Sequence, residues 1–272
     1  MELKYLGTSA SEGMPSLFCN CEACARARHA GGRNIRTRAQ AIVDGKVLLD
    51  FGPDTFMHML VHGVPLYRVQ TCLVTHAHSD HLFAPDLTRR TPILATVEAS
   101  PLTIYGSAPT GQQVAGIMKD TLTGRVEFAL VEPYVAFEAE GYRITPLKAN
   151  HVPELEPLNY LISKDGTTLL YAHDTGYWEE ETWRFFEKER PYLQFASFDC
   201  TMGVLDSRKN HMGLKTVLEV RDRLVDIGCI DSTTICCVSH ISHKGGMTYD
   251  EFAPIAEREG LLLAYDGMAV RF

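Results

Sequence analysis

Short apolar runs, broken by turn residues, alternate with amphipathic stretches along most of the chain. Residues 38–51 place Asp44-Gly45 between two apolar runs, which predicts a β-hairpin with a tight turn. Residues 213–227 predict an amphipathic helix, since apolar side chains recur there at helical spacing: Leu214, Val217, Leu218, Leu224 and Val225. The same patterns predict helices over 54–62, 178–190 and 250–259, and strands over 71–75, 142–147, 167–172, 195–198, 233–238 and 261–265.

This alternation of helices and strands predicts an α/β protein with mixed sheets. The chain has 272 residues, of which 45% are hydrophobic and 22% charged, ordinary values for a globular protein with a sizeable core. No internal repeat, low-complexity tract or linker interrupts it. We therefore expect a single domain over residues 1–272.

The balance of charge argues against a protein whose main task is to grip nucleic acid. Lys and Arg number 26 against 34 Asp and Glu, for a net charge of -8. A small phosphate substrate stays open, because a bound metal can supply local positive charge. No apolar stretch is long enough for a transmembrane helix, and the N-terminus lacks the pattern of a secretory signal. We expect a cytoplasmic protein without membrane partners, in which the eight Cys bind metal or are buried.

Polar residues recur just past apolar runs, where α/β enzymes place their chemistry: Asp50, His76, Asp174, Asp199 and His240. The strongest signal is the segment 75–81, Thr-His-Ala-His-Ser-Asp-His, which follows the strand expected at 71–75. On a tight loop, His76 and His78 can hold one metal while Asp80 and His81 turn to a second. A chance cluster of four ligand-type residues in six positions is the much weaker interpretation.

A second metal site is expected where Cys19, Cys21 and Cys24 form a C-x-C-x-x-C cluster. Three Cys at this spacing in a cytosolic protein indicate a structural zinc that lacks its fourth ligand. His243 is the best candidate for that ligand. The other five Cys lie in or near apolar segments and are interpreted as buried hydrophobic residues: Cys72, Cys200, Cys229, Cys236 and Cys237.

The segment 76–81 resembles the HxHxDH signature of the metallo-β-lactamase superfamily. The resemblance implies a four-layer αββα fold with a metal site at the edge of its two sheets. It also implies further ligands at His151, Asp174 and His240. One divalent ion is then assigned to His76, His78, His151 and Asp174, and the other to Asp80, His81, Asp174 and His240. His173 neighbours Asp174 but points the other way on a strand, so it is interpreted as structural.

The chemistry of such a pair of ions agrees with a hydrolase. Two divalent metals hold a bridging water, lower its pKa and stabilise an anionic transition state. Imidazole and carboxylate ligands suit zinc, manganese or iron and do not decide among them. We expect two zinc or manganese ions in the active site and one structural zinc.

The N-terminal run 7–15, the Cys cluster, the HxHxDH loop and the sequence His240-Ile-Ser-His243 together resemble the PhnP branch of this superfamily. That branch takes its name from a phosphodiesterase of cyclic ribosyl phosphates, and it includes proteins of other or unknown substrate. The PqqB proteins share a similar Cys cluster but typically do not keep the full dinuclear motif, which this chain does.

By the same resemblance, His211 is the general acid that protonates the leaving group, oriented by the carboxylate of Asp199. A neighbouring carboxylate raises the pKa of a histidine, which keeps it protonated near neutral pH. Asp80 is counted with these catalytic residues. A phosphate substrate also needs cations, but none is singled out among the candidates Arg89, Arg90, Lys148, Arg208 and Lys209.

The resemblance favours a phosphodiesterase that acts on a small, cyclic or linear, phosphodiester. A tRNA-processing nuclease is a second hypothesis, weakened by the acidic charge and by the short segment between His151 and Asp174, where such relatives usually carry an RNA-binding insertion. Hydrolysis of a lactone, thioester or β-lactam is a third. A non-catalytic binding protein is a fourth, although such proteins usually lose ligands. The partners expected are a small phosphate ester and, as an open alternative to a monomer, a second copy of the chain.

Overall fold

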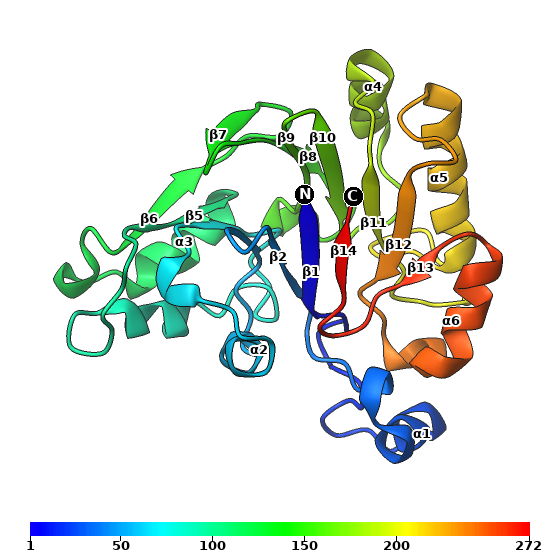
Figure 1. Ribbon diagram of the computed structural model, residues 1–272, viewed down its shortest axis with the longest axis horizontal. Helices are drawn as coiled ribbons and strands as arrows, with labels where there is room; N and C mark the ends of the chain where they lie inside the picture. The colour runs from blue at the N-terminus through cyan, green and yellow to red at the C-terminus, as the bar shows by residue number, and fades with distance from the viewer.

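Two seven-stranded sheets face each other in the computed structural model, which describes residues 1–272 (Figure 1). The first sheet has the order β14-β1-β2-β3-β4-β5-β6, and its strands are β1 (Glu2–Gly7), β2 (Gln40–Val43), β3 (Val47–Leu49), β4 (Thr71–Leu73), β5 (Leu102–Gly106), β6 (Val126–Leu130) and β14 (Ala269–Arg271). The second has the order β13-β12-β11-β10-β9-β8-β7, and its strands are β7 (Phe137–Ala139), β8 (Tyr142–Lys148), β9 (Leu158–Lys164), β10 (Thr167–Ala172), β11 (Phe195–Asp199), β12 (Ile235–Ser239) and β13 (Leu262–Leu263). Both sheets mix parallel and antiparallel pairs, as expected.

The α-helices are α1 (Glu22–Ala30), α2 (Thr55–His62), α3 (Ala108–Ile117), α4 (Glu180–Glu189), α5 (Leu214–Ile227) and α6 (Tyr249–Arg258); α2 to α6 form the two outer layers, and α1 lies below the sheets in Figure 1. In Figure 1, α4, α5 and α6 cover the second sheet, while α2 and α3 lie on the side of the first. No helix is both long and apolar enough to cross a membrane.

Period-two alternation along the strands builds the layers. In β3, Val47 and Leu49 pack between the sheets, while Leu48 joins the cluster on the helix side of the first sheet. In β10, Leu169 likewise faces the other sheet and Leu170 faces the helices of the second layer. The three large hydrophobic clusters are thus one interface between sheets and two interfaces between sheet and helices. The predicted four-layer αββα fold is confirmed.

Local predictions hold where the hydrophobic pattern is strong. The hairpin of β2 and β3 turns at Asp44 and Gly45, which both have positive φ, as a type I′ turn requires. In α5, Val217 and Leu224 are fully buried, but Val225 is 47% exposed, contrary to the predicted stripe. The buried face of α5 includes Val220, which the prediction left out. Val225 is exposed because it lies at the edge of that face in the last turn.

Candidate active site

The predicted metal-binding loop follows β4 of the first sheet and is hydrogen-bonded to the second sheet. Leu158 of the second sheet donates its N–H to the Thr75 carbonyl, 2.8 Å away. The chain after β3 passes close to the same loop at Gly52, where an added Cβ would lie 2.0 Å from the Asp80 carbonyl oxygen. Only glycine fits there, so the sequence at 52 allows the loop to close against its neighbour.

Three imidazole nitrogens converge in a first ligand cluster, formed by His76, His78 and His151. His78 Nδ1 lies 2.7 Å from His76 Nε2 and 3.3 Å from His151 Nε2. The other ring nitrogen of His151 donates to the Asn210 carbonyl at 3.1 Å, so Nε2 is the nitrogen left to bind a metal. The structure therefore brings together three residues that the sequence assigns to one ion.

Asp174 joins this cluster to a second one. Its Oδ2 lies 3.0 Å from the Nε2 atoms of both His81 and His240, while its Oδ1 lies 3.8 Å from His151 Nε2. Asp80 completes the second cluster with Oδ2 at 3.1 Å from His81 Nε2. All seven predicted ligands thus lie together. Asp174 directs Oδ1 toward the first cluster and Oδ2 toward the second.

The buried atoms of the second cluster test whether the site suits a cation. His81 Nε2, Asp174 Oδ2 and His240 Nε2 are all buried and have no hydrogen-bond partner. Burying polar atoms without partners is costly, and nearly all such atoms in proteins are satisfied. A divalent cation between them would take all three lone pairs, and the mixed nitrogen and oxygen donors suit zinc or manganese. The residues therefore fit a metal.

Neighbouring side chains hold these ligands in place through their second nitrogens. His81 Nδ1 lies 2.8 Å from Asp50 Oδ2, and Asp50 also accepts from the Thr75 N–H at 2.7 Å. His240 Nδ1 lies 2.8 Å from Thr201 Oγ1. Such contacts fix the orientation of the ring and raise its basicity as a ligand. The sequence marked Asp50 only by its place after an apolar run and did not reveal this role.

The backbone at the site is bent where strands end. Asp50, Asp174 and His240 have φ values of 67°, 51° and 61°, in the left-handed region that residues other than glycine rarely adopt. Such strain persists only where the surrounding structure imposes it, and it concentrates at functional sites. Here the positive φ values turn the backbone sharply at these three positions, so that side chains from different strands meet.

Burial and charge set the protonation of the ligands. Burial lowers the pKa of His76 and of His151, which keeps both imidazoles neutral and able to bind metal. Burial by itself would raise the pKa of Asp174, but the neighbouring His240 and His81 outweigh it and hold that pKa well below its usual value. Asp174 is therefore a carboxylate, as a ligand to two ions must be.

His211 and Asp199 form the predicted acid pair beside the clusters. His211 Nδ1 lies 3.0 Å from Asp199 Oδ2, and its ring stands 4.9 Å from the ring of His151. Asp199 is fully buried and also accepts from the N–H groups of Thr201 and Met212, both at 3.0 Å. Burial lowers the pKa of His211, but the charge of Asp199 and their hydrogen bond outweigh it and raise that pKa to about 9. His211 therefore carries a proton at neutral pH.

A cleft of about 400 Å³ opens over these groups, and its lining includes His78, Asp80, His151, Asp174, His211 and His240. The cations considered from the sequence do not line it: Lys148 pairs with Glu181 at 2.6 Å, and Arg208 pairs with Glu219. Lys244 is the one Lys or Arg in the lining. Sequence reasoning missed it, although it directly follows the predicted zinc ligand His243.

Residues 46–228 match a family model described as the beta-lactamase superfamily domain. The chain belongs to this superfamily. The matched range contains the HxHxDH loop, His151, Asp174 and His211, while His240 and the Cys cluster lie outside it. This match confirms the resemblance drawn from the HxHxDH motif. It also confirms, at the level of the family, the prediction that the protein is an enzyme.

Sequence relatives and solved structures of the superfamily give a finer comparison. A ribonuclease Z from Listeria innocua is 30% identical over 158 residues, which cover 56% of this chain and 46% of that protein. The chain thus spans about half the length of the curated relatives it matches. A diphosphatase from the PhnP family superposes with a TM-score of 0.75 at 22% identity, over 100% of this chain and 97% of that one. Zinc-bound PqqB from Methylobacterium extorquens gives 0.77 at 19% identity, with both chains fully covered. At these identities the structures show a shared fold.

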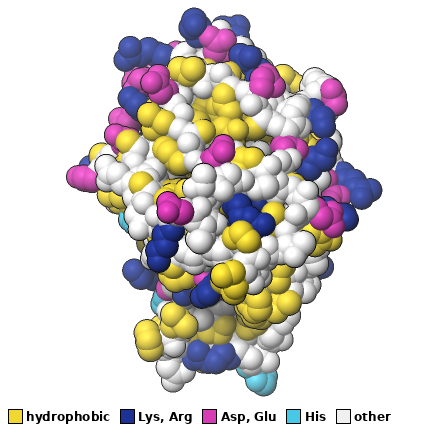
Figure 2. Space-filling view, turned by 90° about the vertical axis from the view of Figure 1, so that its left-hand side faces the viewer, with side chains coloured by type: hydrophobic (Ala, Val, Ile, Leu, Met, Phe, Trp, Pro, Cys, Tyr) yellow, Lys and Arg dark blue, Asp and Glu magenta, His cyan; other side chains and the backbone are white.

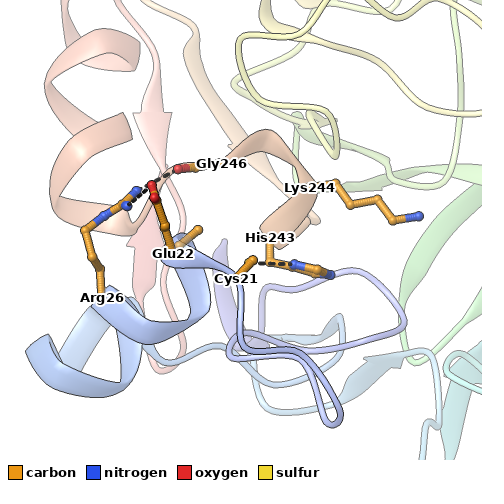
Figure 3. Close-up of a pocket in the computed structure, with 7 residues that line it drawn as sticks. Cys21, Glu22, Arg26, His243, Lys244 and Gly246 are labelled. Atoms are coloured by element: carbon orange, nitrogen blue, oxygen red, sulfur yellow. Dashed lines mark hydrogen bonds and ion pairs between the residues drawn. The ribbon is translucent and has the colours of Figure 1, made fainter.

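The Cys cluster of this superfamily member lies at the edge of the fold, beside α1. The ligand atoms of Cys19, Cys21, Cys24 and His243 all lie within 4.8 Å of one another. His243 Nδ1 is 3.7 Å from Cys19 Sγ and 3.5 Å from Cys21 Sγ, near the ~3.6 Å that two ligands of one tetrahedral zinc would show. Figure 3 shows Cys21 and His243 facing each other. The fourth ligand predicted from the sequence is therefore where a zinc site needs it.

The electrostatics of the Cys cluster also suit a cation. A hydrogen bond from the Cys24 backbone and the contact with His243 lower the pKa of Cys21 to about 6, and a thiolate is the form that binds zinc. The remaining five Cys are buried and unpaired, as predicted. His173 lies outside every ligand cluster, with Nε2 2.8 Å from Ser197 Oγ and its ring against Tyr171, in agreement with a structural role.

Proposed function

We propose that the protein is a metal-dependent phosphodiesterase that hydrolyses a small phosphodiester in the cleft over the two ligand clusters. The observation that carries this proposal is the His211–Asp199 pair, in which His211 lines the same cleft as the ligands and Asp199 is buried behind it. Two divalent ions, zinc or manganese, would supply Lewis acidity and lower the pKa of a water molecule there. We assign one ion to His76, His78, His151 and Asp174, and the other to Asp80, His81, Asp174 and His240.

His211 is the general acid of this proposal. Asp199 occupies its Nδ1, so Nε2 is the ring nitrogen left to face the leaving oxygen of a substrate. An alkoxide needs a proton on departure, whereas a thiolate does not, so a positioned acid favours an oxygen ester over a thioester. Asp80, which lines the same cleft, takes part as a ligand beside the reacting group.

The nature of the relatives supports phosphodiester chemistry, since the name ribonuclease Z denotes cleavage of RNA, itself a phosphodiester. A small substrate is favoured by the segment between His151 and Asp174. It holds only a short 3₁₀ turn and the paired strands β9 and β10, which stay within the second sheet and leave no projecting arm. Figure 2 shows one face of the molecule on which basic and acidic side chains are interspersed among apolar ones.

A cytoplasmic setting belongs to this proposal, because thiols stay reduced there and a Cys cluster can hold zinc. The structural zinc is assigned to Cys19, Cys21, Cys24 and His243. A single domain and a homodimer stay predictions.

The experiment that tests the proposal is hydrolysis of bis(p-nitrophenyl) phosphate by protein loaded with manganese or zinc. Asp174→Ala serves as the blank, and Asp226→Ala, at an exposed position of α5, serves as the matched control. Turnover by the wild type and the control but not by the blank supports a metal phosphodiesterase, and cyclic phosphates are tested next. A metal-loaded wild type that fails to turn over this diester contradicts it and favours lactones, then thioesters.

Processing of tRNA is the second candidate, because the sequence relatives include ribonuclease Z. It predicts that precursor tRNA binds in a gel-shift assay and is cleaved with loss of activity in Asp174→Ala. The absence of a shifted band at micromolar protein, together with turnover of the small diester, would leave the small substrate as the function.

A further inference from the structure

The carboxylate of Asp199, at the end of β11, lies between the proposed general acid and a ligand of the His/Asp clusters. β11 and β12 are parallel neighbours in which Asp199 pairs with Ser239, so His240 follows at the adjacent strand end (Figure 1). Asp199 Oδ2 lies 3.0 Å from His211 Nδ1 and 3.5 Å from His240 Nδ1. Two imidazole nitrogens therefore approach the same carboxylate oxygen.

Backbone groups already bind both oxygens of this carboxylate. Oδ1 accepts the N–H groups of Thr201 and Met212, both at 3.0 Å, and Oδ2 accepts the N–H of Asp174 at 3.1 Å. The two oxygens of a carboxylate offer about four lone-pair sites in all. A second imidazole at Oδ2 would therefore compete with the hydrogen bond that orients His211.

The hydroxyl of Thr201 lies between His240 and this carboxylate. Its Oγ1 is 2.8 Å from His240 Nδ1, which is closer than Asp199 Oδ2 comes to that nitrogen, and 3.1 Å from Asp199 Oδ2 itself. A hydroxyl has one proton and two lone pairs, so it can accept from one group while it donates to another. Thr201 Oγ1 is also 3.2 Å from His211 Nδ1, but that nitrogen is nearer to Asp199.

The direction of these hydrogen bonds follows from the nitrogen that faces the metal site. His240 Nε2 is buried without a partner beside Asp174, which makes it the nitrogen for a metal and leaves the ring proton on Nδ1. His240 Nδ1–H then donates to the hydroxyl of Thr201, and this hydroxyl donates to Asp199. One chain of hydrogen bonds thus connects a predicted metal ligand to the partner of the general acid.

Thr201 is itself held in place by its backbone. Its N–H donates to Asp199 Oδ1, and its carbonyl accepts the N–H of Ser242 at 3.0 Å. The residue is 4% exposed and lines the cleft. Because these backbone bonds do not involve the side chain, a change of Thr201 to Val removes the hydroxyl and leaves them in place.

We propose that Thr201 is a positioning residue, whose hydroxyl accepts the hydrogen bond of His240 Nδ1–H and so leaves Asp199 Oδ2 free to orient His211. The inference rests on the proposed function and adds to it one residue that serves metal binding and acid catalysis together. Without the hydroxyl, His240 Nδ1 has Asp199 Oδ2 as its nearest other acceptor, 3.5 Å away. The carboxylate would then be shared between the two rings, and His211 would lose its fixed orientation toward the leaving oxygen.

The first test observes the ring protons and needs no turnover. Zinc-loaded protein with ¹⁵N-labelled histidine rings is studied by NMR, and the Nδ1–H signal of His211 is identified by its loss in His211→Gln. In Thr201→Val this proton should exchange with solvent about tenfold faster, as loss of one charge-assisted hydrogen bond would give. Thr201→Ser, which keeps the hydroxyl, should exchange like the wild type, as should the control Thr96→Val at an exposed position.

An unchanged His211 signal in Thr201→Val would overturn the proposal, and so would equal changes in the Val and Ser variants. Thr201→Ala also lacks the hydroxyl and replaces Thr201→Val if the backbone NMR spectrum shows that the Val variant does not fold. The same outcomes then apply.

The second test compares two leaving groups at saturating metal. With an alkoxide leaving group, as in a 2′,3′-cyclic nucleotide, kcat of Thr201→Val should fall about 10²-fold while KM stays the same, and Thr201→Ser should restore it. With bis(p-nitrophenyl) phosphate, whose leaving group departs without a proton, the fall should be much smaller. Equal losses with both substrates would mean that Thr201 does not act through His211. A protein that shows the NMR effect but hydrolyses neither substrate would contradict the proposed function and support the arrangement of the two rings by Thr201.

Discussion

The His/Asp clusters and the Cys cluster both collect metal-binding side chains, but they differ in burial and in support. His76, His81 and Asp174 are at most 3% exposed, whereas Cys21 is open to solvent. The buried ligands are held by further side chains such as Asp50 and Thr201, and by strand ends of both sheets. The Cys ligands lie on a loop and the start of α1, where Cys24 is buried. His243 connects them to the rest of the fold, together with the contacts of Arg26 with Gly246 and Glu251.

This difference indicates what each ion contributes. At the buried site the fold has already arranged the ligands, so an ion adds chemistry and satisfies polar atoms that would otherwise be costly to bury. At the exposed site few other contacts hold the ligands together, so an ion adds a cross-link between segments far apart in sequence. Removing a ligand should therefore cost activity in the first region and mainly stability in the second.

The largest effect is expected from Asp174→Ala, because Asp174 faces both groups of buried ligands. Turnover of bis(p-nitrophenyl) phosphate should fall by at least about 10³-fold, as a loss of several kcal/mol of charge stabilisation would give. Metal analysis should show the loss of active-site ions while the zinc of the Cys cluster stays. Full activity in this variant would refute the assignment of Asp174 as the shared ligand.

His211→Gln should separate acid catalysis from metal binding. With an alkoxide leaving group, as in a 2′,3′-cyclic nucleotide, the rate should fall about 10²- to 10⁴-fold. With p-nitrophenolate, which departs without a proton, the fall should be much smaller, and the metal content should not change. His29→Gln, at an exposed position of α1, is the control. An equal loss with both leaving groups would mean that His211 acts in some other way.

Asp50→Asn tests the support behind the buried ligands. Asn keeps the size of the side chain but removes the charge that faces His81 Nδ1, so metal affinity should fall by about 10- to 100-fold. A competition titration with a chromogenic chelator measures this, with Asp222→Asn on the exposed face of α5 as the control. Unchanged affinity would show that the fold, and not Asp50, holds His81 in place.

The smallest effect on chemistry is expected from Cys21→Ala. Loss of one ligand should lower the melting temperature by about 5 °C, through partial loss of the zinc cross-link. The variant should still take up the active-site ions, and Asn20→Ala, at the neighbouring exposed position, should melt like the wild type. If hydrolysis of bis(p-nitrophenyl) phosphate disappears without a change in melting, the structural interpretation of the Cys cluster is wrong.

Sequence reasoning succeeded where the signal is local. The residues from His76 to His81 are close in the chain, so their spacing alone indicated a metal loop, and the hairpin and α5 followed from short-range patterns. It failed where the pattern is weak: α1 went unpredicted, since its buried side chains are two small Ala residues and Cys24 among charged neighbours. It also placed Val225 in the core, because periodicity alone does not say how wide the buried face of a helix is.

The sequence by itself determined the kinds of ligand, their local spacing and the alternation that builds four layers. Tertiary structure alone decided that Asp50 supports His81, 31 residues away, and that Thr201 supports His240, 39 residues away. The ligand His243 is an intermediate case, because an incomplete Cys cluster called for a partner that only the fold could bring across 222 residues. Periodicity records which face of an element is buried, whereas contacts between distant residues depend on how the two sheets pack and where their strands end.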